Sequence, residues 1–572
     1  MGIPSREPNV LGNTGLSAFD AIVIGSGAGG SVAAYALATG GRKVLVLEAG
    51  DNYFPGLDDP APGQPVPLFS NDELKMSERN LISPDPLVEP RTFRPNEGAG
   101  DRVFTGDVNG LPKTVGGGAV HADMKYPRFQ ETDFRIRSLL GEVPGASFAD
   151  WPLTYDELEP FYTEVETIVG VQGEDDSDPF AAPRSRPFVM PPGAPMYTAL
   201  LAAEGARKLG YTPFPYPTAV NSRPYRDRPP CVDCGFCSGY GCPNNSKGSP
   251  AVTFLRDALL SENCQLRYNC QVARLVANGT KTRVDAVEYI DAEGNRQQVQ
   301  ADIVVLAASP IEDARLCFLS DPDGDGLGNS SGLVGRNLMF HLQTTAVGIF
   351  QQRIHGHRGR SITHGLSDFR GVPGDPGRPL AGILELGAAS ELIFEAKTYA
   401  FSLFRRGAEL KEFMRQSPLR DRLMGLTLQA EDAPQLTNRV DLDPAVRDVY
   451  GLPVPRITYE NHAFELSARE FYSPKLLALI EASGAQIGFI APPDTPSTSH
   501  HIMGTLRMGD GPQSSVCDRF GRFHDLENLY CADGGVFVSS SGFNPTLTLQ
   551  ALALRMAGNI ISPGNAERAL RD

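Results

Sequence analysis

The residue types needed for general-base chemistry lie in the last quarter of the chain. His500 and His501 begin the string HHIMGTLRMG, and Asn544 lies in GFNPT, directly before an apolar stretch that predicts a helix over 547–560. The ordinary pKa of histidine lies near neutral pH, so its ring can accept a proton from a reacting hydroxyl group. An amide nearby can orient an oxygen and stabilise developing negative charge.

A glycine-rich turn near the other end of the chain predicts a second kind of chemistry. Gly25, Gly27 and Gly30 have the spacing G-x-G-x-x-G, and Glu48 follows them. Glycines allow a tight turn and let the backbone approach a pyrophosphate, which binds at the N-terminus of the next helix. Glu48 can accept hydrogen bonds from ribose hydroxyls, and an acid here disfavours a 2′-phosphate. These residues predict a dinucleotide site.

The elements around this turn fit that site. An apolar run predicts a buried parallel strand over 21–24, and an Ala- and Leu-rich stretch predicts a helix over 31–39. Gly40 follows as a C-terminal cap, and a second strand is expected over 43–47. The order strand, glycine turn, helix, strand, acid is much more specific than the glycine spacing alone.

A second part of the same fold is expected between residues 265 and 308. Alternating residues predict strands over 265–277 and 283–290, followed by a buried strand over 302–308. A β-meander that replaces a crossover helix fits the flavin type of nucleotide-binding fold better than the NAD type. The stretch 126–230 shows one clear helix, over 155–169, with Thr154 as its N-cap.

The remaining middle of the chain predicts a domain that covers the substrate. Strand-like runs over 345–350 and 381–386 alternate with charged helices. The predicted fold class is mixed α/β (α+β), in which a Rossmann-like nucleotide-binding domain is interleaved with a substrate domain built on an antiparallel sheet. The predicted boundaries are 15–125, 230–335 and 495–572 for the first domain, and 126–229 and 336–494 for the second.

Composition excludes several classes of protein. The chain has 572 residues, of which 41% are hydrophobic and 21% charged, with a net charge of −16. The acidic balance disfavours nucleic acid or an anionic membrane as a partner. No apolar run reaches the ~18 residues of a membrane span, and the first residues lack the apolar core of a signal peptide. A cytoplasmic location is therefore expected.

Four of the nine cysteines form a cluster with the spacing C-x2-C-x2-C-x4-C, at Cys231, Cys234, Cys237 and Cys242. This spacing is similar to that of iron–sulfur proteins, and zinc or a disulfide would also be compatible with it. We expect a structural cluster without metal, with these alternatives left open.

Seven strings occur in the order typical of one family. They are GSGAGG…LEAG, TVGGGAVHADMKYPRF, CVDCGFCSGYGCPNNSKGS, ADIVVLAASPIEDARL, SGLVGRNLMFH, HIMGTLRMG and NLYCADGGVFVSSSGFNPTLTLQALALR. Over nearly its whole length the chain resembles the glucose–methanol–choline (GMC) family of flavin-dependent alcohol oxidoreductases. The strings are most similar to the bacterial branch with gluconate and fructose dehydrogenase flavin subunits and pyranose oxidases.

The resemblance implies FAD as the cofactor and assigns residues to it. Those implied to bind or approach FAD are Gly25, Gly27, Gly30, Glu48, Gly116, Gly117, Gly118, His121, Val272, Asp533, Gly534, Asn544, Pro545 and Thr546. His121 falls where pyranose oxidases carry a histidine joined covalently to the flavin, and we expect a noncovalent contact here.

The resemblance also implies catalytic roles for two residues. His501 matches the histidine of H-x-x-G-T and would be the catalytic base, with Asn544 as its partner. His500 does not align with the histidine of this motif and is not expected to be the base. His341 is expected to be a buried structural histidine.

The function implied is oxidation of a CH–OH group, favouring a sugar, glycoside or polyol, by hydride transfer to flavin N5. The alternatives are a steroid or long-chain alcohol as substrate, a flavin-bearing lyase without net redox chemistry, and the flavin subunit of a membrane dehydrogenase. The expected partners are the alcohol and an electron acceptor, either oxygen or another carrier. The oligomeric state is left open.

Overall fold

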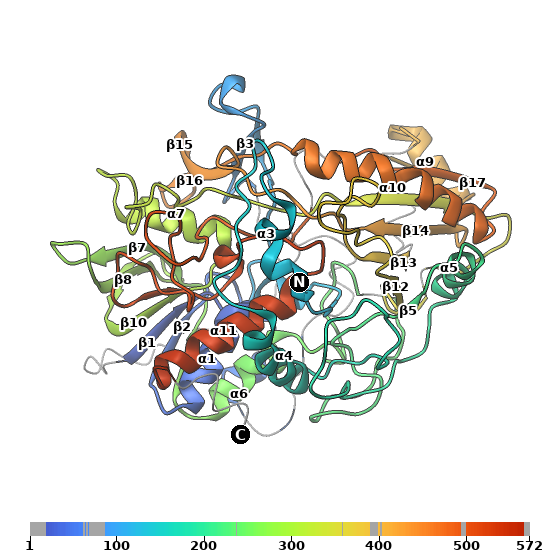
Figure 1. Cartoon of the computed structure of the whole chain (residues 1–572). Helices are drawn as coiled ribbons and strands as arrows, with labels where there is room; N and C mark the ends of the chain where they lie inside the picture. Colours follow the sequence, from blue (N-terminus) through green and yellow to red (C-terminus); the bar gives the residue numbers. More distant parts are fainter. Residues whose placement is uncertain are drawn as a thin grey trace.

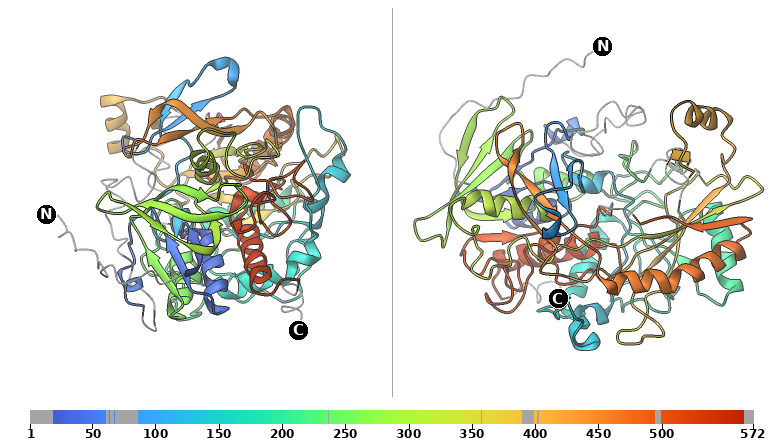
Figure 2. Two further views of the ribbon diagram at one scale, coloured as in Figure 1. Left: turned by 90° about the vertical axis from the view of Figure 1, so that its left-hand side faces the viewer. Right: turned by 90° about the horizontal axis from the view of Figure 1, so that it is seen from above.

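The computed structural model describes residues 19–60, 63, 67, 86–235, 237–356, 358–388, 399–400, 403–493 and 499–564. A parallel sheet with its helices lies at one side of the molecule, and a larger antiparallel sheet lies at the other (Figure 1). Two further views show that the chain crosses repeatedly between the two sides (Figure 2).

The parallel sheet is formed from strands far apart in the sequence. Its five strands have the order β18-β10-β1-β2-β6, and every neighbouring pair is parallel. Their bounds are Phe19–Ile24 (β1), Val44–Leu47 (β2), Cys264–Arg267 (β6), Ala301–Leu306 (β10) and Leu529–Cys531 (β18). The strands predicted over 21–24 and 43–47 therefore exist and are neighbours.

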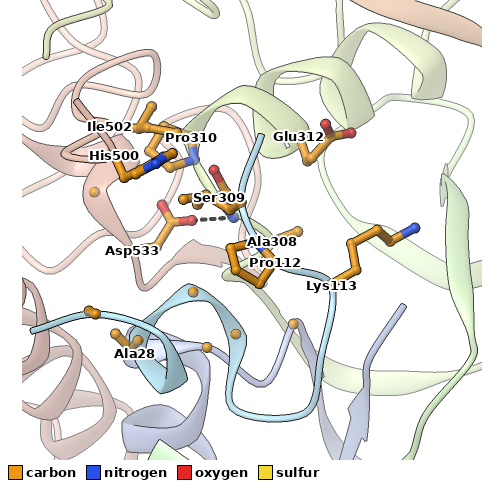
Figure 3. Close-up of a pocket in the computed structure, with 18 of the residues that line it drawn as sticks. Ala28, Pro112, Lys113, Ala308, Ser309, Pro310, Glu312, His500, Ile502 and Asp533 are labelled. Carbon is orange, nitrogen blue, oxygen red and sulfur yellow. Dashed lines mark hydrogen bonds between the residues drawn. The ribbon is translucent and has the colours of Figure 1, made fainter. Parts of the chain in front are cut away.

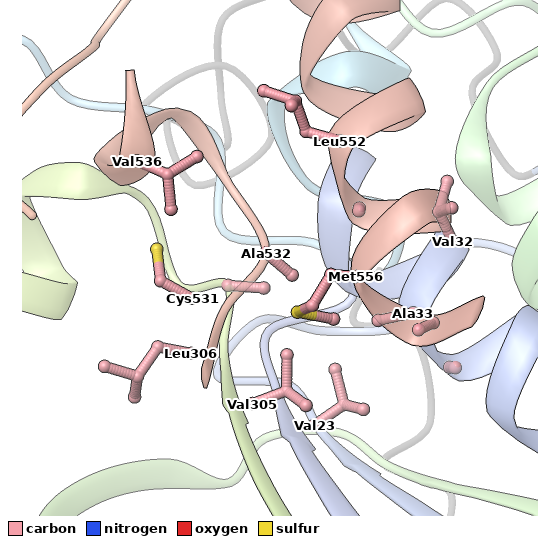
Figure 4. Packing of buried hydrophobic residues seen from close by; sticks show 14 of the residues in the cluster. Val23, Val32, Ala33, Val305, Leu306, Cys531, Ala532, Val536, Leu552 and Met556 are labelled. Carbon is pink, nitrogen blue, oxygen red and sulfur yellow. The ribbon is translucent and has the colours of Figure 1, made fainter. Parts of the chain in front are cut away.

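Helices cover this sheet and make the largest apolar core. They include α1 (Ala28–Thr39), α6 (Phe254–Leu260), α4 (Tyr155–Val169) and α11 (Thr546–Ile561). Figure 4 shows Val23 and Val305 of the sheet facing Val32 of α1 and Met556 of α11. The predicted helix over 155–169 has these bounds in the structure, and the Thr154 hydroxyl caps it by accepting from the Glu157 N–H at 3.4 Å.

The prediction of one strand over 265–277 is wrong. The structure has two strands there, β6 and β7 (Gln271–Ala277), which belong to different sheets. Asn269 between them has a left-handed backbone, with φ of 55°. Alternation of residue types does not reveal such a turn. Strand β7 instead forms a three-stranded antiparallel sheet with β8 (Val284–Ile290) and β9 (Arg296–Val299).

The antiparallel sheet on the other side has six strands in the order β17-β11-β14-β13-β12-β5. Their bounds are Phe214–Pro215 (β5), Thr344–Ile349 (β11), His364–Leu366 (β12), Leu384–Ala388 (β13), Leu423–Leu428 (β14) and Ile487–Ile490 (β17). Helices α5 (Tyr197–Lys208) and α10 (Ala463–Ala482) pack on this sheet.

Helix α5 corrects the expectation of a single helix between 126 and 230. Its sequence is short and includes Gly205, which weakens the helical pattern. A Cβ at Gly205 would lie 2.5 Å from the Ser483 hydroxyl oxygen, so the glycine allows close packing against the end of α10. Tertiary contact therefore stabilises a helix that local preference leaves ambiguous.

A four-stranded sheet combines two strands from the first fifth of the chain with two from residues 439–458. It has the order β15-β16-β3-β4. The bounds are Arg91–Arg94 (β3), Phe104–Gly106 (β4), Arg439–Arg447 (β15) and Pro453–Thr458 (β16). The predicted boundaries put each of the two larger sheets in one domain, whereas this sheet takes strands from both.

The other described helices are α3 (Ile136–Leu140), α7 (Pro310–Ser320) and α9 (Gly407–Gln416). Among the described residues, none of the helices combines the length and the apolar character that a membrane crossing requires.

Candidate functional site

A cavity of about 640 Å³ extends from the glycine turn to the six-stranded sheet. We call its two parts the glycine-turn end and the sheet end. The glycine-turn end includes Gly25, Gly27, Glu48, Val272 and Asp533. The sheet end includes Asp123, Lys125, Gln343, Thr345, Glu385, Thr427, His501 and Asn544. This volume lies in the range typical of ligand sites.

The glycines of the turn have different roles. Gly25 has φ of 98°, and a Cβ there would lie 2.3 Å from the Ala307 carbonyl oxygen. A Cβ at Gly30 would lie 2.0 Å from the Gly25 carbonyl oxygen, so this glycine allows the helix to pack on the strand. Gly27 has open space, because a Cβ there would approach nothing closer than the Gly117 Cα at 3.8 Å. Gly27 also precedes α1, whose N-terminus has no side-chain cap.

Glu48 is nearly buried and keeps one position for a further hydrogen bond. Its Oε2 accepts from the Ser26 N–H at 2.9 Å and the Ser26 hydroxyl at 2.6 Å. Its Oε1 accepts from the Gly50 N–H at 2.8 Å. A carboxylate can accept about four hydrogen bonds, and Glu48 lines the cavity. The remaining acceptor position suits a ribose hydroxyl.

A second glycine run contacts the first. The Gly116 N–H donates to the Ser26 hydroxyl oxygen at 3.0 Å, and a Cβ at Gly117 would lie 2.7 Å from the Gly27 Cα. Gly117 begins a short 3-10 helix, Gly117–Val120, which carries the chain to His121. His121 is buried and lines the cavity, and its carbonyl accepts from the Gly239 N–H at 3.0 Å.

Asp533 is held firmly beside the glycine-turn end. It accepts from the Ser309 N–H and the Gly535 N–H, each at 2.8 Å, and Figure 3 shows the first of these bonds. Asp313 is a buried carboxyl group close to Asp533. Burial raises the pKa of both groups, and the Asp533 charge also raises that of Asp313, so the pair favours a shared proton.

The cavity brings together most of the predicted site residues. Those that line it are Gly25, Gly27, Glu48, Gly117, Gly118, His121, Val272, His501, Asp533, Gly534, Asn544, Pro545 and Thr546. Gly30 and Gly116 are not among the lining residues. Gly30 allows α1 to pack on β1, and the Gly116 N–H joins the second glycine run to Ser26 of the first.

At the sheet end, His501 is fixed by a second histidine. The Nδ1 atoms of His341 and His501 are 2.8 Å apart, and His341 Nε2 lies 3.0 Å from the Ser540 carbonyl oxygen. A carbonyl only accepts, so His341 Nε2 carries a proton and donates it to Ser540. Neutral His341 then presents an unprotonated Nδ1, which accepts from the Nδ1–H of His501. The Nε2 of His501 is therefore unprotonated.

Asn544 approaches that same nitrogen from the other side. Its Nδ2 lies 3.4 Å from His501 Nε2 and 3.4 Å from the Glu385 Oε1. The buried Tyr216 hydroxyl donates to its Oδ1, so the amide nitrogen and not the oxygen faces His501. Both neighbours thus leave His501 Nε2 as an acceptor.

The surroundings also keep the two rings neutral. Burial lowers the pKa of His341 to about 4. Burial also lowers the pKa of His501 well below its ordinary value, and the neighbouring His341, Lys125 and His500 lower it further. A neutral ring is the form that can accept a proton.

The structure distinguishes the two adjacent histidines. His501, and not His500, makes the contacts with His341 and Asn544. His500 is exposed, although it also lines the cavity, above Asp533 in Figure 3.

The sequence predicts that His341 is a buried structural histidine. It is buried, and in addition it contacts the predicted base. Its place in SGLVGRNLMFH, one of the family strings, was the available signal.

Other polar residues at the sheet end were not anticipated. Lys125 Nζ lies 3.0 Å from Asp123 Oδ2 and 2.7 Å from Glu385 Oε2. Asp123 and Lys125 follow His121 within a family string, but Glu385 lies on β13 with no sequence signal. Gln343, Thr345 and Thr427 add further polar groups from β11, β14 and the residues before β11.

A dinucleotide fits the glycine-turn end. The open space at Gly27, the uncapped N-terminus of α1 and the spare acceptor of Glu48 match a pyrophosphate and a ribose. Val272 and Cys270 extend the cavity beyond Glu48, where an adenine is expected.

The cysteine cluster lies beside this cavity. Cys231 is half-buried, Cys234 exposed, Cys237 buried and Cys242 half-buried. Burial raises the pKa of Cys231 to about 12 and that of Cys237 to about 11. Among the described residues, the one group of three His, Cys, Asp or Glu ligand atoms close enough to share a metal is Asp313, Cys531 and Asp533.

Family models match three parts of the chain. A model described as "NAD(P)-binding Rossmann-like domain" matches residues 23–57. Two models described as "GMC oxidoreductase" match residues 189–343 and 434–553.

Curated relatives are similar over almost the whole chain. The 2-methyl-1,2-propanediol dehydrogenase of Mycolicibacterium austroafricanum is 31% identical, over 95% of this chain and 95% of its own. The fructose dehydrogenase large subunit of Gluconobacter japonicus is 30% identical, over 96% of this chain and 99% of its own.

A solved structure has the same fold at low sequence identity. Formate oxidase of Aspergillus oryzae superposes with a TM-score of 0.65 and 15% identity, over 97% of this chain and 100% of that chain.

Proposed function

This chain belongs to the GMC oxidoreductase family of FAD-dependent enzymes that oxidise alcohol groups, and we propose that it acts on a small polyhydroxylated alcohol with His501 as the base. The observation that carries the proposal is the pair of contacts around the His501 ring: His341 accepts from its Nδ1–H, and the Asn544 amide nitrogen faces its Nε2, so Nε2 is the atom that can accept a proton. Polar side chains of the six-stranded sheet surround the same part of the cavity.

Different residues of the site accept the proton, orient the substrate and bind the cofactor. The substrate hydroxyl donates its proton to His501 Nε2, while the Asn544 amide orients the substrate oxygen. FAD, when bound, accepts the hydride from the carbon that carries this hydroxyl, so the alcohol becomes a carbonyl compound. The glycine turn, Glu48 and Asp533 would hold the cofactor, and Gly117, Gly118 and His121 are proposed to contact its flavin part. We propose a noncovalent contact for His121.

The polar sheet end favours a sugar or polyol over a steroid or a long-chain alcohol. Gln343 donates to Gln429 at 3.2 Å, and the Thr345 and Thr427 hydroxyls are 3.2 Å apart, so hydrogen-bonding groups face one another across β11 and β14. An alkyl chain would remove water from these groups without replacing its hydrogen bonds. The relatives named for a diol and for fructose fit this choice.

The experiment is an anaerobic screen of purified holoenzyme against sugars, diols and long-chain primary alcohols, followed by flavin absorbance. Bleaching by a polyol is expected, and a carbonyl product should form in equal amount. Bleaching by long-chain alcohols alone would contradict the substrate class. Turnover without bleaching would indicate lyase chemistry. Readmission of air then tests whether oxygen reoxidises the flavin or another carrier is needed.

A further inference from the structure

A largely buried ion triad at the sheet end, formed by Asp123, Lys125 and Glu385, is not used by the proton transfer just described. Lys125 Nζ donates to Asp123 Oδ2 at 3.0 Å and to Glu385 Oε2 at 2.7 Å. The side chains of Lys125 and Asp123 are 16% and 14% exposed, and that of Glu385 is 2% exposed. All three residues line the cavity. Placing three charges in a ligand cavity costs desolvation energy that stability alone does not explain.

The triad is adjacent to the proposed catalytic pair. Glu385 Oε1 lies 3.4 Å from Asn544 Nδ2, and Asn544 Nδ2 lies 3.4 Å from His501 Nε2. A chain of contacts therefore joins the ammonium group to the base. His501, Asn544 and the triad all line the same cavity, so a ligand that contacts His501 can extend toward the triad.

The ammonium group retains a hydrogen-bond donor. An ammonium group has three N–H bonds, and two of them are occupied by Asp123 and Glu385. The part of the chain that the structure describes supplies no acceptor for the third. The side chain is nevertheless held in place by the two carboxylates.

The local charges favour a neutral ligand for this donor. Asp123 also feels the charge of the buried Lys247, whose ammonium group is bound by the carbonyls of Ala122, Cys237 and Tyr240. Two carboxylates thus face two ammonium groups. These charges balance, so the site needs no carboxylate or amine on the substrate. A hydroxyl oxygen can accept from the third N–H of Lys125 without adding charge.

We propose that Lys125, held by Asp123 and Glu385, binds a second hydroxyl group, on the carbon next to the one that is oxidised. Lys125 is then a specificity-determining residue that selects vicinal diols over simple alcohols. This inference rests on the proposed function, because it takes the substrate hydroxyl at His501 as its reference point.

The test compares matched pairs of alcohols that differ by one hydroxyl. Propane-1,2-diol is compared with propan-1-ol, and D-glucose with 2-deoxy-D-glucose, in holoenzyme and in Lys125→Met. Two readouts are used: the rate of anaerobic flavin reduction, and binding measured by the change in the oxidised flavin spectrum. We expect the unmodified enzyme to prefer the diol of at least one pair by roughly 10–100-fold, as one hydrogen bond to a charged group allows.

Lys125→Met should remove this preference, because it should weaken diol binding much more than monoalcohol binding. Because the change leaves two carboxylates together, the double variant Lys125→Met/Glu385→Gln is tested in parallel, since it restores the net charge of the triad. Lys281→Met, at an exposed ion pair with Asp321, is the control and should retain the preference. FAD content reports whether each variant is folded.

The outcomes separate the two proposals. Equal losses for diol and monoalcohol, or no preference in the unmodified enzyme, would overturn the role of Lys125 and leave the alcohol oxidation standing. Diol-selective binding that depends on Lys125, without any flavin reduction, would support the recognition site and overturn the proposed reaction.

Discussion

The two ends of the cavity are built in different ways. At the glycine-turn end, the backbone determines the shape: Gly25, Gly30 and Gly117 are required because a Cβ would collide with neighbouring chain. At the sheet end, side chains from separate strands and loops determine the chemistry. His341 and His501, for example, are 160 positions apart in the sequence. The shape of the turn from Gly25 to Gly30 therefore follows from local glycine spacing, whereas the proposed proton transfer and substrate choice depend on residues that are far apart in the sequence.

Replacing His501 with Ala should have the largest effect on flavin reduction and should leave cofactor binding unchanged. The variant should retain FAD, because the glycine turn is untouched, and flavin reduction by the alcohol should slow by about 10²–10⁴-fold, as expected on loss of a general base. Stopped-flow reduction under anaerobic conditions measures this. His500→Ala is the matched control and should have a mild effect. If His500→Ala is the inactive variant, the assignment of the base is wrong.

Replacing Glu48 with Ala should weaken cofactor binding at the glycine-turn end of the cavity. The change removes the spare acceptor for the ribose and the bonds to Ser26 and Gly50. Charge-assisted hydrogen bonds contribute about 1.5–3 kcal/mol, so FAD affinity should fall by roughly 10–100-fold. Equilibrium dialysis measures retention, and Glu204→Ala, on the exposed face of α5, is the control. After saturation with FAD, the reduction rate should return; if it does not, the two ends are coupled.

Replacing His341 with Leu should show whether the sheet end depends on the pair of histidines. Without the acceptor at His341 Nδ1, His501 is free to carry its proton on Nε2, where it cannot act as a base. We expect roughly 10–100-fold slower flavin reduction with normal FAD content. His341→Gln offers an amide oxygen to the same N–H and should recover most of the rate. Equal losses in both variants would indicate a purely structural role.

The pH dependence of flavin reduction tests whether His501 is neutral. Burial lowers the pKa of His501, so the ring stays neutral and active as the pH falls through 6.5, and activity should decline only at lower pH. Because His341 contributes to this lowering, His341→Leu should move the acid limb toward higher pH. A wild-type limb above pH 6.5 would contradict the predicted direction.

Asn544→Ala should have a smaller effect than loss of the base. The amide orients the substrate oxygen and accepts no proton, so reduction should slow by about 10-fold with an unchanged pH profile. Tyr216→Phe is a useful companion, because it removes the hydrogen bond that orients the amide. A shifted pH profile in Asn544→Ala would indicate that Asn544 takes part in proton transfer.

Of these variants, His121→Ala should have the smallest effect. If the flavin contact is noncovalent, acid precipitation of the unmodified protein leaves yellow colour in the supernatant, and the variant behaves in the same way. Colour that stays in the pellet of the unmodified protein and leaves it in the variant would establish a covalent link.

Features that depend on neighbouring residues could be predicted from the sequence. The turn from Gly25 to Gly30, the strands on either side and the capped helix Tyr155–Val169 follow from glycine spacing, apolar runs and an N-cap, all of which are local. The family strings added the order of the remaining motifs. The location in the cytoplasm and the absence of metal at the cysteine cluster stay predictions.

Which polar groups come into contact could not be predicted without the folded chain. The break at Asn269, the helix around Gly205, the pairing of His341 with His501 and the Lys125–Glu385 contact join segments that are distant in sequence or depend on one backbone angle. Hydrogen-bond partners across such distances leave no periodic or compositional trace. The proposed proton acceptor, His501, could therefore be named from a family string, but its tautomer, its neutral charge and its neighbours required the folded chain.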